Sequence, residues 1–212
     1  MKLDNLKINI LGDSISKGRC ASVDDLGYVG LLQRKYPNAV IRNYSVPGSC
    51  ISNKCLWGLR SFCERADEMD PDADLVVVFG GSNDYGCCCP LGQWGDKTDD
   101  TFYGACWMLY DKLLRVYHGK TIVVITPLHR IEEDGTICEG RQMVAPLKAY
   151  VEIEKEVAEY FGFPVIDLFA TSGFQPNLDY IREAYTTDGL HPNDIGHEML
   201  LRKVEGALSN IY

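Results

Sequence analysis

The sequence predicts a three-layer α/β/α fold, flavodoxin-like, with helices on both faces of a five-stranded parallel sheet. Strand-length apolar segments alternate with amphipathic helical segments along the whole chain. The third apolar segment, residues 73–79, is continuously apolar, as expected of a central parallel strand that is covered on both faces. No repeat or linker divides the 212 residues, so we expect a single domain over residues 1–212.

The predicted elements follow one another regularly. Buried strands are expected at residues 7–12, 40–46, 73–79, 120–126 and 163–168. Helices are expected at residues 27–36, 56–69, 101–118, 142–161 and 194–211. In the second helix, for example, apolar side chains recur at steps of three and four residues. Right-handed crossovers between parallel strands bring the carboxyl ends of all strands to one edge, where ligands bind in such sheets.

Composition narrows the possible classes of function. A net charge of −9, from 30 acidic and 21 basic residues, disfavours a nucleic-acid partner. The longest apolar runs, such as residues 75–79 and 122–125, are too short to span a bilayer. The first residues lack the apolar stretch of a secretory signal, so we expect a cytoplasmic protein with reduced thiols.

The nine cysteines show no CxxC pair and no zinc-finger spacing with histidine, so no metal site is predicted. The run Cys87, Cys88 and Cys89 follows the third predicted strand closely. It is either a loop of incidental thiols, which we prefer, or a pocket wall or gate that senses redox state or metal.

Chemically suggestive residues follow the first three strands at the ligand-binding edge. Ser14 comes after the first strand, where its hydroxyl could be a nucleophile or could cap the next helix. Gly48 follows the second strand and Asn83 follows the third. Either could donate a hydrogen bond to an oxyanion, and either could belong to an ordinary turn.

Near the end of the chain, Asp188 lies three residues before His191 on a loop punctuated by glycine and proline. One turn can bring the carboxylate to the imidazole, which could then take a proton from Ser14. The alternative is a capping loop with His191 at the surface. We prefer the catalytic interpretation because carboxylate, histidine and serine are all predicted at one edge of the sheet.

Other residues at this edge are candidate substrate contacts. His129, after the fourth strand, is the rival of His191 as a base, and with Arg130 it could instead contact the substrate. Asp13 and Tyr85 are further candidates, because they adjoin the predicted nucleophile and the predicted amide donor. The long loops at residues 86–101 and 170–186 could build the pocket.

Together these segments resemble the SGNH, or GDSL-like, hydrolase family over residues 8–196. The residues that name the family fall on Ser14 in Gly-Asp-Ser, Gly48, Asn83 in Gly-Ser-Asn-Asp, and His191 in Asp-Gly-Leu-His-Pro. Each motif is short, but the four occur in the family's order and spacing. Ile15 replaces the leucine of the GDSL motif, an apolar exchange that leaves the chemistry untouched. No GxSxG elbow is present, which argues against an α/β-hydrolase arrangement.

The resemblance implies a serine-dependent hydrolase of carboxylic esters that needs no cofactor and no metal. Its triad would be Ser14, His191 and Asp188, and its oxyanion hole would combine the N–H groups of Ser14 and Gly48 with the Asn83 side chain. The family includes enzymes for lipid, carbohydrate and small acyl esters. The short chain favours a small-molecule ester with a small or carbohydrate-linked acyl group. The alternatives are a lysophospholipase or thioesterase with an apolar acyl channel, and a non-catalytic ligand-binding or thiol-sensing module.

Overall fold

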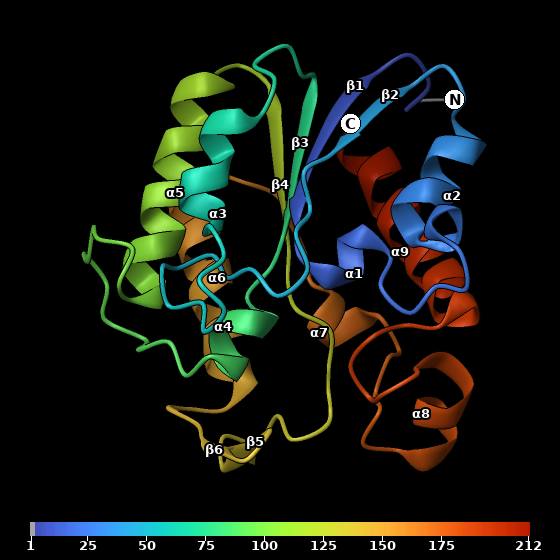
Figure 1. Ribbon diagram of the computed structural model, residues 1–212. Helices are drawn as coiled ribbons and strands as arrows, with labels where there is room; N and C mark the ends of the chain where they lie inside the picture. Colours follow the sequence, from blue (N-terminus) through green and yellow to red (C-terminus); the bar gives the residue numbers. More distant parts are fainter. Residues whose placement is uncertain (1–2) are drawn as a thin grey trace.

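The computed structural model describes residues 3–212 and has the three layers that the sequence predicts (Figure 1). Its central sheet is five-stranded, with the order β2-β1-β3-β4-β7 and parallel pairing throughout. The strands are β1 (Lys7–Gly12), β2 (Val40–Asn43), β3 (Leu75–Phe79), β4 (Thr121–Ile125) and β7 (Val165–Ile166). The predicted flavodoxin-like sheet is therefore confirmed.

Helices cover both faces of this sheet (Figure 1). On one face lie α3 (Phe62–Arg65), α5 (Phe102–Val116) and α6 (Leu147–Phe161), and on the other lie α2 (Tyr28–Lys35) and α9 (Asp194–Ile211). Side chains of β3 alternate between the two cores: Val76 and Val78 pack toward α5 and α6, whereas Val77 and Phe79 pack toward α2 and α9. The continuous apolar run of β3 thus reflects burial on both faces. None of the helices in residues 3–212 is long and apolar enough to cross a membrane.

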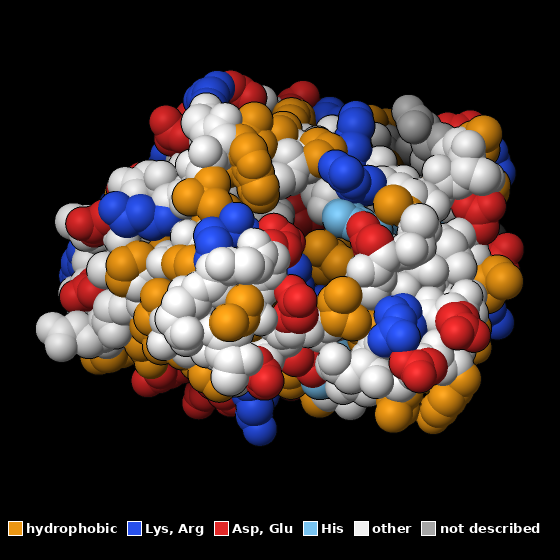
Figure 2. Space-filling model, turned by 60° about the horizontal axis from the view of Figure 1, so that its bottom comes forward, with side chains coloured by type: hydrophobic (Ala, Val, Ile, Leu, Met, Phe, Trp, Pro, Cys, Tyr) orange, Lys and Arg blue, Asp and Glu red, His pale blue; other side chains and the backbone are white. Residues whose placement is uncertain are grey.

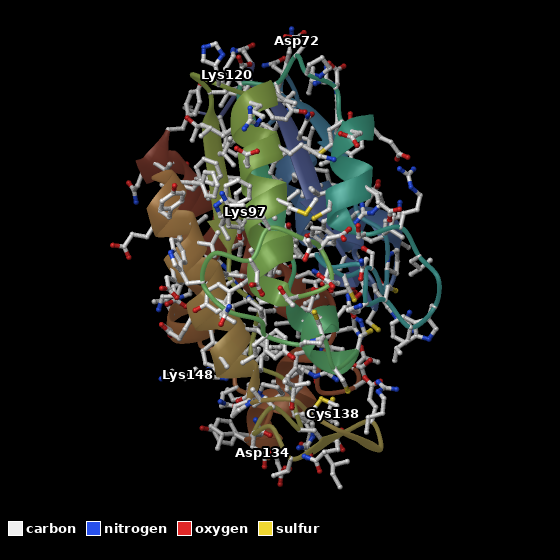
Figure 3. The ribbon with its side chains drawn as sticks, turned by 90° about the vertical axis from the view of Figure 1, so that its left-hand side faces the viewer. Asp72, Lys97, Lys120, Asp134, Cys138 and Lys148 are labelled. Atoms are coloured by element: carbon white, nitrogen blue, oxygen red, sulfur yellow. The ribbon has the colours of Figure 1, made fainter. Side chains whose placement is uncertain are left out.

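Short elements gather where the strands end (Figure 1). These are α1 (Ser14–Lys17), α4 (Ser82–Gly86), α7 (Leu168–Thr171), α8 (Asp179–Tyr185) and the antiparallel pair of β5 (Ile137–Cys138) and β6 (Arg141–Gln142). Short 3₁₀ turns, η1 (Asp24–Leu26) and η2 (Ala66–Glu68), complete the elements. Figure 3 shows Asp134 and Cys138 at this end of the molecule and Asp72 and Lys120 at the opposite end. The carboxyl edge of the sheet therefore carries most of the irregular structure.

Two predicted helices begin later than expected. The helix predicted from residue 56 begins at Phe62, because Ser61 and Glu64 form a capping box there. The helix predicted from residue 142 begins at Leu147, after Pro146. The residues before it are occupied by the hairpin of β5 and β6, which the sequence pattern did not reveal.

Two predicted strands are shorter than expected by three residues or more. The strand predicted at residues 40–46 ends at Asn43, although Tyr44 and Val46 still donate to Ile10 and Gly12 of β1. The strand predicted at residues 163–168 is reduced to β7, because Asp167 accepts from Ala170 N and begins α7. Both changes bring irregular backbone to the carboxyl edge.

Glu154 is a buried acid on α6 that contacts the turn leading into α4. It is 1% exposed, and neither of its carboxyl oxygens has a hydrogen-bond partner. A β-carbon added to Gly81 would lie 2.4 Å from Glu154 Oε1, so the carboxyl packs directly on this glycine. Burial, together with the nearby carboxylates of Asp84 and Asp13, raises the pKa of Glu154 well above its ordinary value. The folded protein therefore favours the neutral acid.

We predict that Glu154→Gln stabilises the protein increasingly as the pH rises. Below pH 4.5 the Glu154 carboxyl is neutral in both folded and unfolded chains. At higher pH only the unfolded chain ionises readily, so wild-type stability falls relative to that of the glutamine variant. Each kcal/mol of difference should change Tm by about 2–4 °C in a chain of this size. Thermal unfolding between about pH 5 and pH 8 measures the effect.

The exposed Glu159 of the same helix offers a matched control, Glu159→Gln. A Tm difference between Glu154→Gln and wild type that stays constant with pH, or that matches the Glu159 control, contradicts the prediction.

Candidate active site

Ser14, His191 and Asp188 form a continuous hydrogen-bonded chain. Ser14 is the first residue of α1, directly beyond the end of β1, and its Oγ lies 2.9 Å from His191 Nε2. The other ring nitrogen, Nδ1, lies 2.7 Å from Asp188 Oδ2. With its proton on Nδ1, the ring donates to the carboxylate and can accept the Ser14 hydroxyl proton at Nε2. The structure thus brings together the three residues that the sequence predicted as a triad.

The Asp188 carboxylate is held in place by its own loop. Its Oδ1 accepts hydrogen bonds from the backbone N–H groups of Leu190 and His191, at 3.0 and 2.7 Å. Partial burial alone would raise its pKa, but the hydrogen bonds from the His191 ring and backbone keep the pKa below the ordinary range. Asp188 therefore remains ionised and can stabilise an imidazolium.

Gly48 and Asn83 lie beside Ser14 in one cavity. The Asn83 amide, on α4, donates to Ser49 O at 3.0 Å and to Asp13 Oδ2 at 3.3 Å, which fixes its direction. Gly48 has a φ of +81°, a conformation that favours glycine, in the turn that follows β2. As the first residue of α1, Ser14 has an N–H group without an intrahelical acceptor. The arrangement suits the binding of an oxyanion.

Asp13 holds Ser14 and Asn83 in position. Its Oδ1 accepts from Ile15 N at 2.9 Å and caps α1, while its Oδ2 accepts from Asn83. Burial raises the pKa of Asp13 to about 6. Its side chain is buried and does not line the cavity, so the expected substrate contact does not fit its position. It acts on the placement of Ser14 and Asn83 instead.

Arg65 is a buried cation that the sequence analysis missed. Its guanidinium donates to the carbonyl of Tyr44, to Gly12 O at 3.2 Å and to Ser49 Oγ at 2.8 Å. It therefore ties the end of β1 to the segment that follows β2. Burial lowers the pKa of Arg65 to about 10, so it stays charged at neutral pH. An arginine one turn from apolar Phe62, within a predicted amphipathic helix, was the available signal.

Asp84 ties α4 to the same segment from the other side. Its carboxylate accepts from Ile51 N at 2.8 Å, from Ser52 N at 2.9 Å and from Ser52 Oγ at 2.6 Å. It is fully buried, and burial raises its pKa to about 6. Because Asn83 precedes Asp84 on α4, these bonds set the distance between Asn83 and the Gly48 turn.

The cavity has a volume of about 370 Å³ and a mixed lining. Its lining residues are Ser14, Arg19, Gly48, Trp57, Asn83, Arg130, Ile131, Glu132, Glu139, Asp188, Leu190 and His191. Figure 2 shows this end of the molecule, where a histidine surface lies in a hollow among basic and acidic side chains. Arg130 lines the cavity, as the sequence predicted, and its guanidinium lies 3.0 Å from a carboxylate oxygen of Glu139.

Two expected substrate contacts lie elsewhere. Tyr85 is fully buried, and its hydroxyl donates to the carbonyl of Glu132. His129 hydrogen-bonds Glu133 at 2.8 Å and stacks on Phe169, with ring centroids 3.8 Å apart. Neither side chain lines the catalytic cavity, so His129 is not placed to act as the base for Ser14.

The cavity wall comes from segments other than the two loops that the sequence suggested. In the loop at residues 86–101, Trp94 packs against Tyr160 of α6 and Lys97 lies over the Trp107 ring of α5. Figure 3 shows Lys97 beside α5. Neither the Cys87–Cys89 run nor any other residue of 86–101 or 170–186 lines the cavity. The wall is formed instead by the segment between β4 and α6 and by Arg19 and Trp57. Their positions depend on contacts that no local pattern encodes.

Comparison with known proteins agrees with this site. The profile of the GDSL-like lipase/acylhydrolase family matches residues 10–199, nearly the whole chain. The chain belongs to this family. The resemblance inferred from the four motifs is therefore confirmed, and this GDSL-like hydrolase is an ester hydrolase. A search of curated proteins gives no match.

Solved structures resemble this GDSL-like hydrolase over nearly its full length. One is 31% identical, with 100% of this chain and 99% of that chain covered and a TM-score of 0.88. A protein from Lactobacillus plantarum is 27% identical, with 99% of both chains covered and a TM-score of 0.87. An acetyl xylan esterase, AlAXEase, is 21% identical, with 95% and 99% covered and a TM-score of 0.67, which shows a shared fold.

We predict that Arg65→Met lowers both stability and activity. Hydrogen bonds from a charged donor contribute about 1.5–3 kcal/mol each, and the variant leaves three buried acceptors without their donor. The Gly48 turn should then shift, and a displacement of about 1 Å can cost on the order of 10²-fold in rate. Urea unfolding and hydrolysis of an aryl ester measure the two effects.

Arg60→Met is the matched control, because Arg60 is an exposed arginine five residues away whose side chain pairs with Glu68. If Arg65→Met unfolds at the same urea concentration as this control and retains full activity, Arg65 does not hold the site together.

Proposed function

We propose that this protein is a serine esterase that removes small acyl groups from polar alcohols, carbohydrates among them, through an acyl-enzyme on Ser14. The observation that carries the proposal is the 2.9 Å contact between Ser14 Oγ and His191 Nε2, in a small cavity with a mixed lining. The family supports ester hydrolysis, and the cavity supports the choice of substrate.

The reaction would proceed in two steps. His191 Nε2 takes the hydroxyl proton as Ser14 Oγ attacks the ester carbonyl, and Asp188 stabilises the resulting imidazolium. The oxyanion would receive hydrogen bonds from the N–H groups of Ser14 and Gly48 and from the Asn83 amide. His191 then protonates the leaving alcohol. Water, deprotonated by His191, attacks the acyl-enzyme and releases the acid.

The cavity favours a small acyl group and a polar alcohol. Its volume of about 370 Å³ lies at the small end for ligand pockets, and its charged lining suits hydroxyl groups better than an alkyl chain. The Trp57 side chain is 57% exposed beside Gly48 and offers an indole face on which a sugar ring can lie. The acetyl xylan esterase with the same fold is consistent with such a substrate.

We predict that Asn83→Ala lowers turnover of an aryl ester by about 10²–10³-fold, because one donor to the oxyanion is lost. Unfolding free energy should fall by only about 1–2 kcal/mol, the contribution of its two hydrogen bonds. Steady-state kinetics and urea unfolding check both numbers. Asn53→Ala, which removes an exposed amide bonded to Asp99, is the control.

Labelling with a fluorophosphonate tests the nucleophile directly. Wild type and Asn53→Ala should be labelled at Ser14, and Ser14→Ala should not. A folded wild-type protein that is inert to the probe would indicate a non-catalytic binding module. Parental turnover in Asn83→Ala would remove Asn83 from the site.

Activity should fall as the acyl chain lengthens. On nitrophenyl esters of acetate, butyrate, octanoate and dodecanoate, we predict that kcat/KM is highest for the two short chains. Each step to octanoate and beyond should lose at least about tenfold, or 1.4 kcal/mol, because a cavity of about 370 Å³ is too small to bury the added methylenes. The opposite order, with the long chains preferred, would identify a lipase-like or thioesterase-like acyl channel and overturn the substrate assignment.

A further inference from the structure

Cys20 places a thiol beside the catalytic histidine. Its Sγ, a carboxylate oxygen of Asp188 and a ring nitrogen of His191 all lie within 4.8 Å of one another. Sulfur, imidazole nitrogen and carboxylate oxygen are the three donor types that Zn²⁺ prefers in proteins. The mechanism above uses two of these groups and leaves the thiol without a role.

The backbone around Cys20 is fixed by contacts with α1 and α9. Arg19 N donates to Ser14 O at 2.9 Å, and the His197 ring of α9 lies 3.3 Å from Arg19 O. Ser22 N donates to Asp194 Oδ1 at 2.7 Å. Because Asp194 follows His191 by three residues, these bonds hold the thiol and the imidazole on one rigid unit.

Cys20 also borders a hollow that is separate from the catalytic cavity. Cys20 is partly exposed and lines a separate open hollow with Ser22, Asn193, Asp194 and Ile195. It is not among the residues that line the catalytic cavity. An ion can therefore approach Cys20 without passing through the cavity.

We propose that Cys20, Asp188 and His191 form an inhibitory Zn²⁺ site, with water as the fourth ligand. Zinc–ligand distances of about 2.0–2.3 Å require donor atoms roughly 3.5 Å apart. The Cys20 thiol therefore needs to approach by about 1 Å, and Asp188 needs to move back from Nδ1, which is 2.7 Å away. The thiol gives up its proton to solvent as the sulfur–zinc bond forms, and no oxidation takes place. His191 contributes a ring-nitrogen lone pair.

Zinc at this site stops the reaction by removing the base. The metal binds Nδ1, the ring nitrogen that faces Asp188, and the proton of Nδ1 moves to Nε2. Nε2 then carries a hydrogen and has no lone pair with which to accept the Ser14 proton. Because the ion is held only by coordinate bonds to these side chains, a chelator removes it and restores activity.

The test compares zinc inhibition of the full-length wild type, Cys20→Ser and Cys88→Ser, in metal-buffered solution with an aryl ester. Cys88 is a matched control, because it is also partly exposed and also has a positive φ, 56° against 68° for Cys20. Without zinc, all three proteins should turn over alike. Removing a residue that only hydrogen-bonds a metal ligand costs about 10–100-fold in metal affinity. Removing a ligand itself, the Cys20 thiol, should therefore weaken zinc inhibition by roughly 100-fold or more.

Cobalt(II) gives a readout that does not depend on activity. Wild type and Cys88→Ser should show a thiolate-to-cobalt charge-transfer band with one ion per chain, and Cys20→Ser should not. Equal zinc inhibition of Cys20→Ser and wild type, or a cobalt spectrum without that band in wild type, overturns the proposal. A protein that binds cobalt through Cys20 but hydrolyses no ester would refute the proposed esterase function and leave the metal site standing.

Discussion

The hydrogen bond between Ser14 and His191 joins two residues that are 177 positions apart in the sequence. It exists because β1 delivers Ser14 to the carboxyl edge of the sheet, while α9 packs against α2 and presents the loop before it at the same edge. Asp188 adds a local constraint, since it holds both the ring and the backbone N–H of His191. The remaining parts of the site are arranged around this contact.

Several ionisable side chains are buried beneath the site, and their burial does not favour stability. Asp13, Asp84 and Glu154 are three buried acids, and the Arg65 guanidinium lies close to Asp13. Burying such groups costs free energy unless hydrogen bonds compensate, and Glu154 has none. The burial of Asp13, Asp84 and Arg65 costs stability. Their hydrogen bonds in turn hold Ser14, Asn83 and the Gly48 turn in fixed positions. Donors that are oriented before the substrate arrives are what stabilises a developing oxyanion.

For the cysteines, closeness to the catalytic motifs in the sequence does not predict closeness to the catalytic residues in space. The Cys87–Cys89 run attracted attention because three cysteines follow the Asn83 motif closely, yet the run lies outside the catalytic cavity. Cys20, an isolated thiol in the sequence, lies within 4.8 Å of the catalytic dyad. The difference arises because the chain turns back at Gly18, the left-handed end of α1, and so brings the next residues toward α9.

The five-stranded parallel sheet, the two-sided burial of β3 and the placement of Ser14, Gly48, Asn83, Asp188 and His191 at one edge follow from the sequence alone. Apolar periodicity and short glycine-rich motifs are local signals, and parallel strands have only one edge at which such motifs can meet. Only the tertiary structure decided the cavity wall, with Arg19, Trp57 and Glu139, and the buried support from Arg65 and Asp84. Those roles depend on which distant segments pack together, and side-chain contacts across the fold leave no periodic trace in the chain.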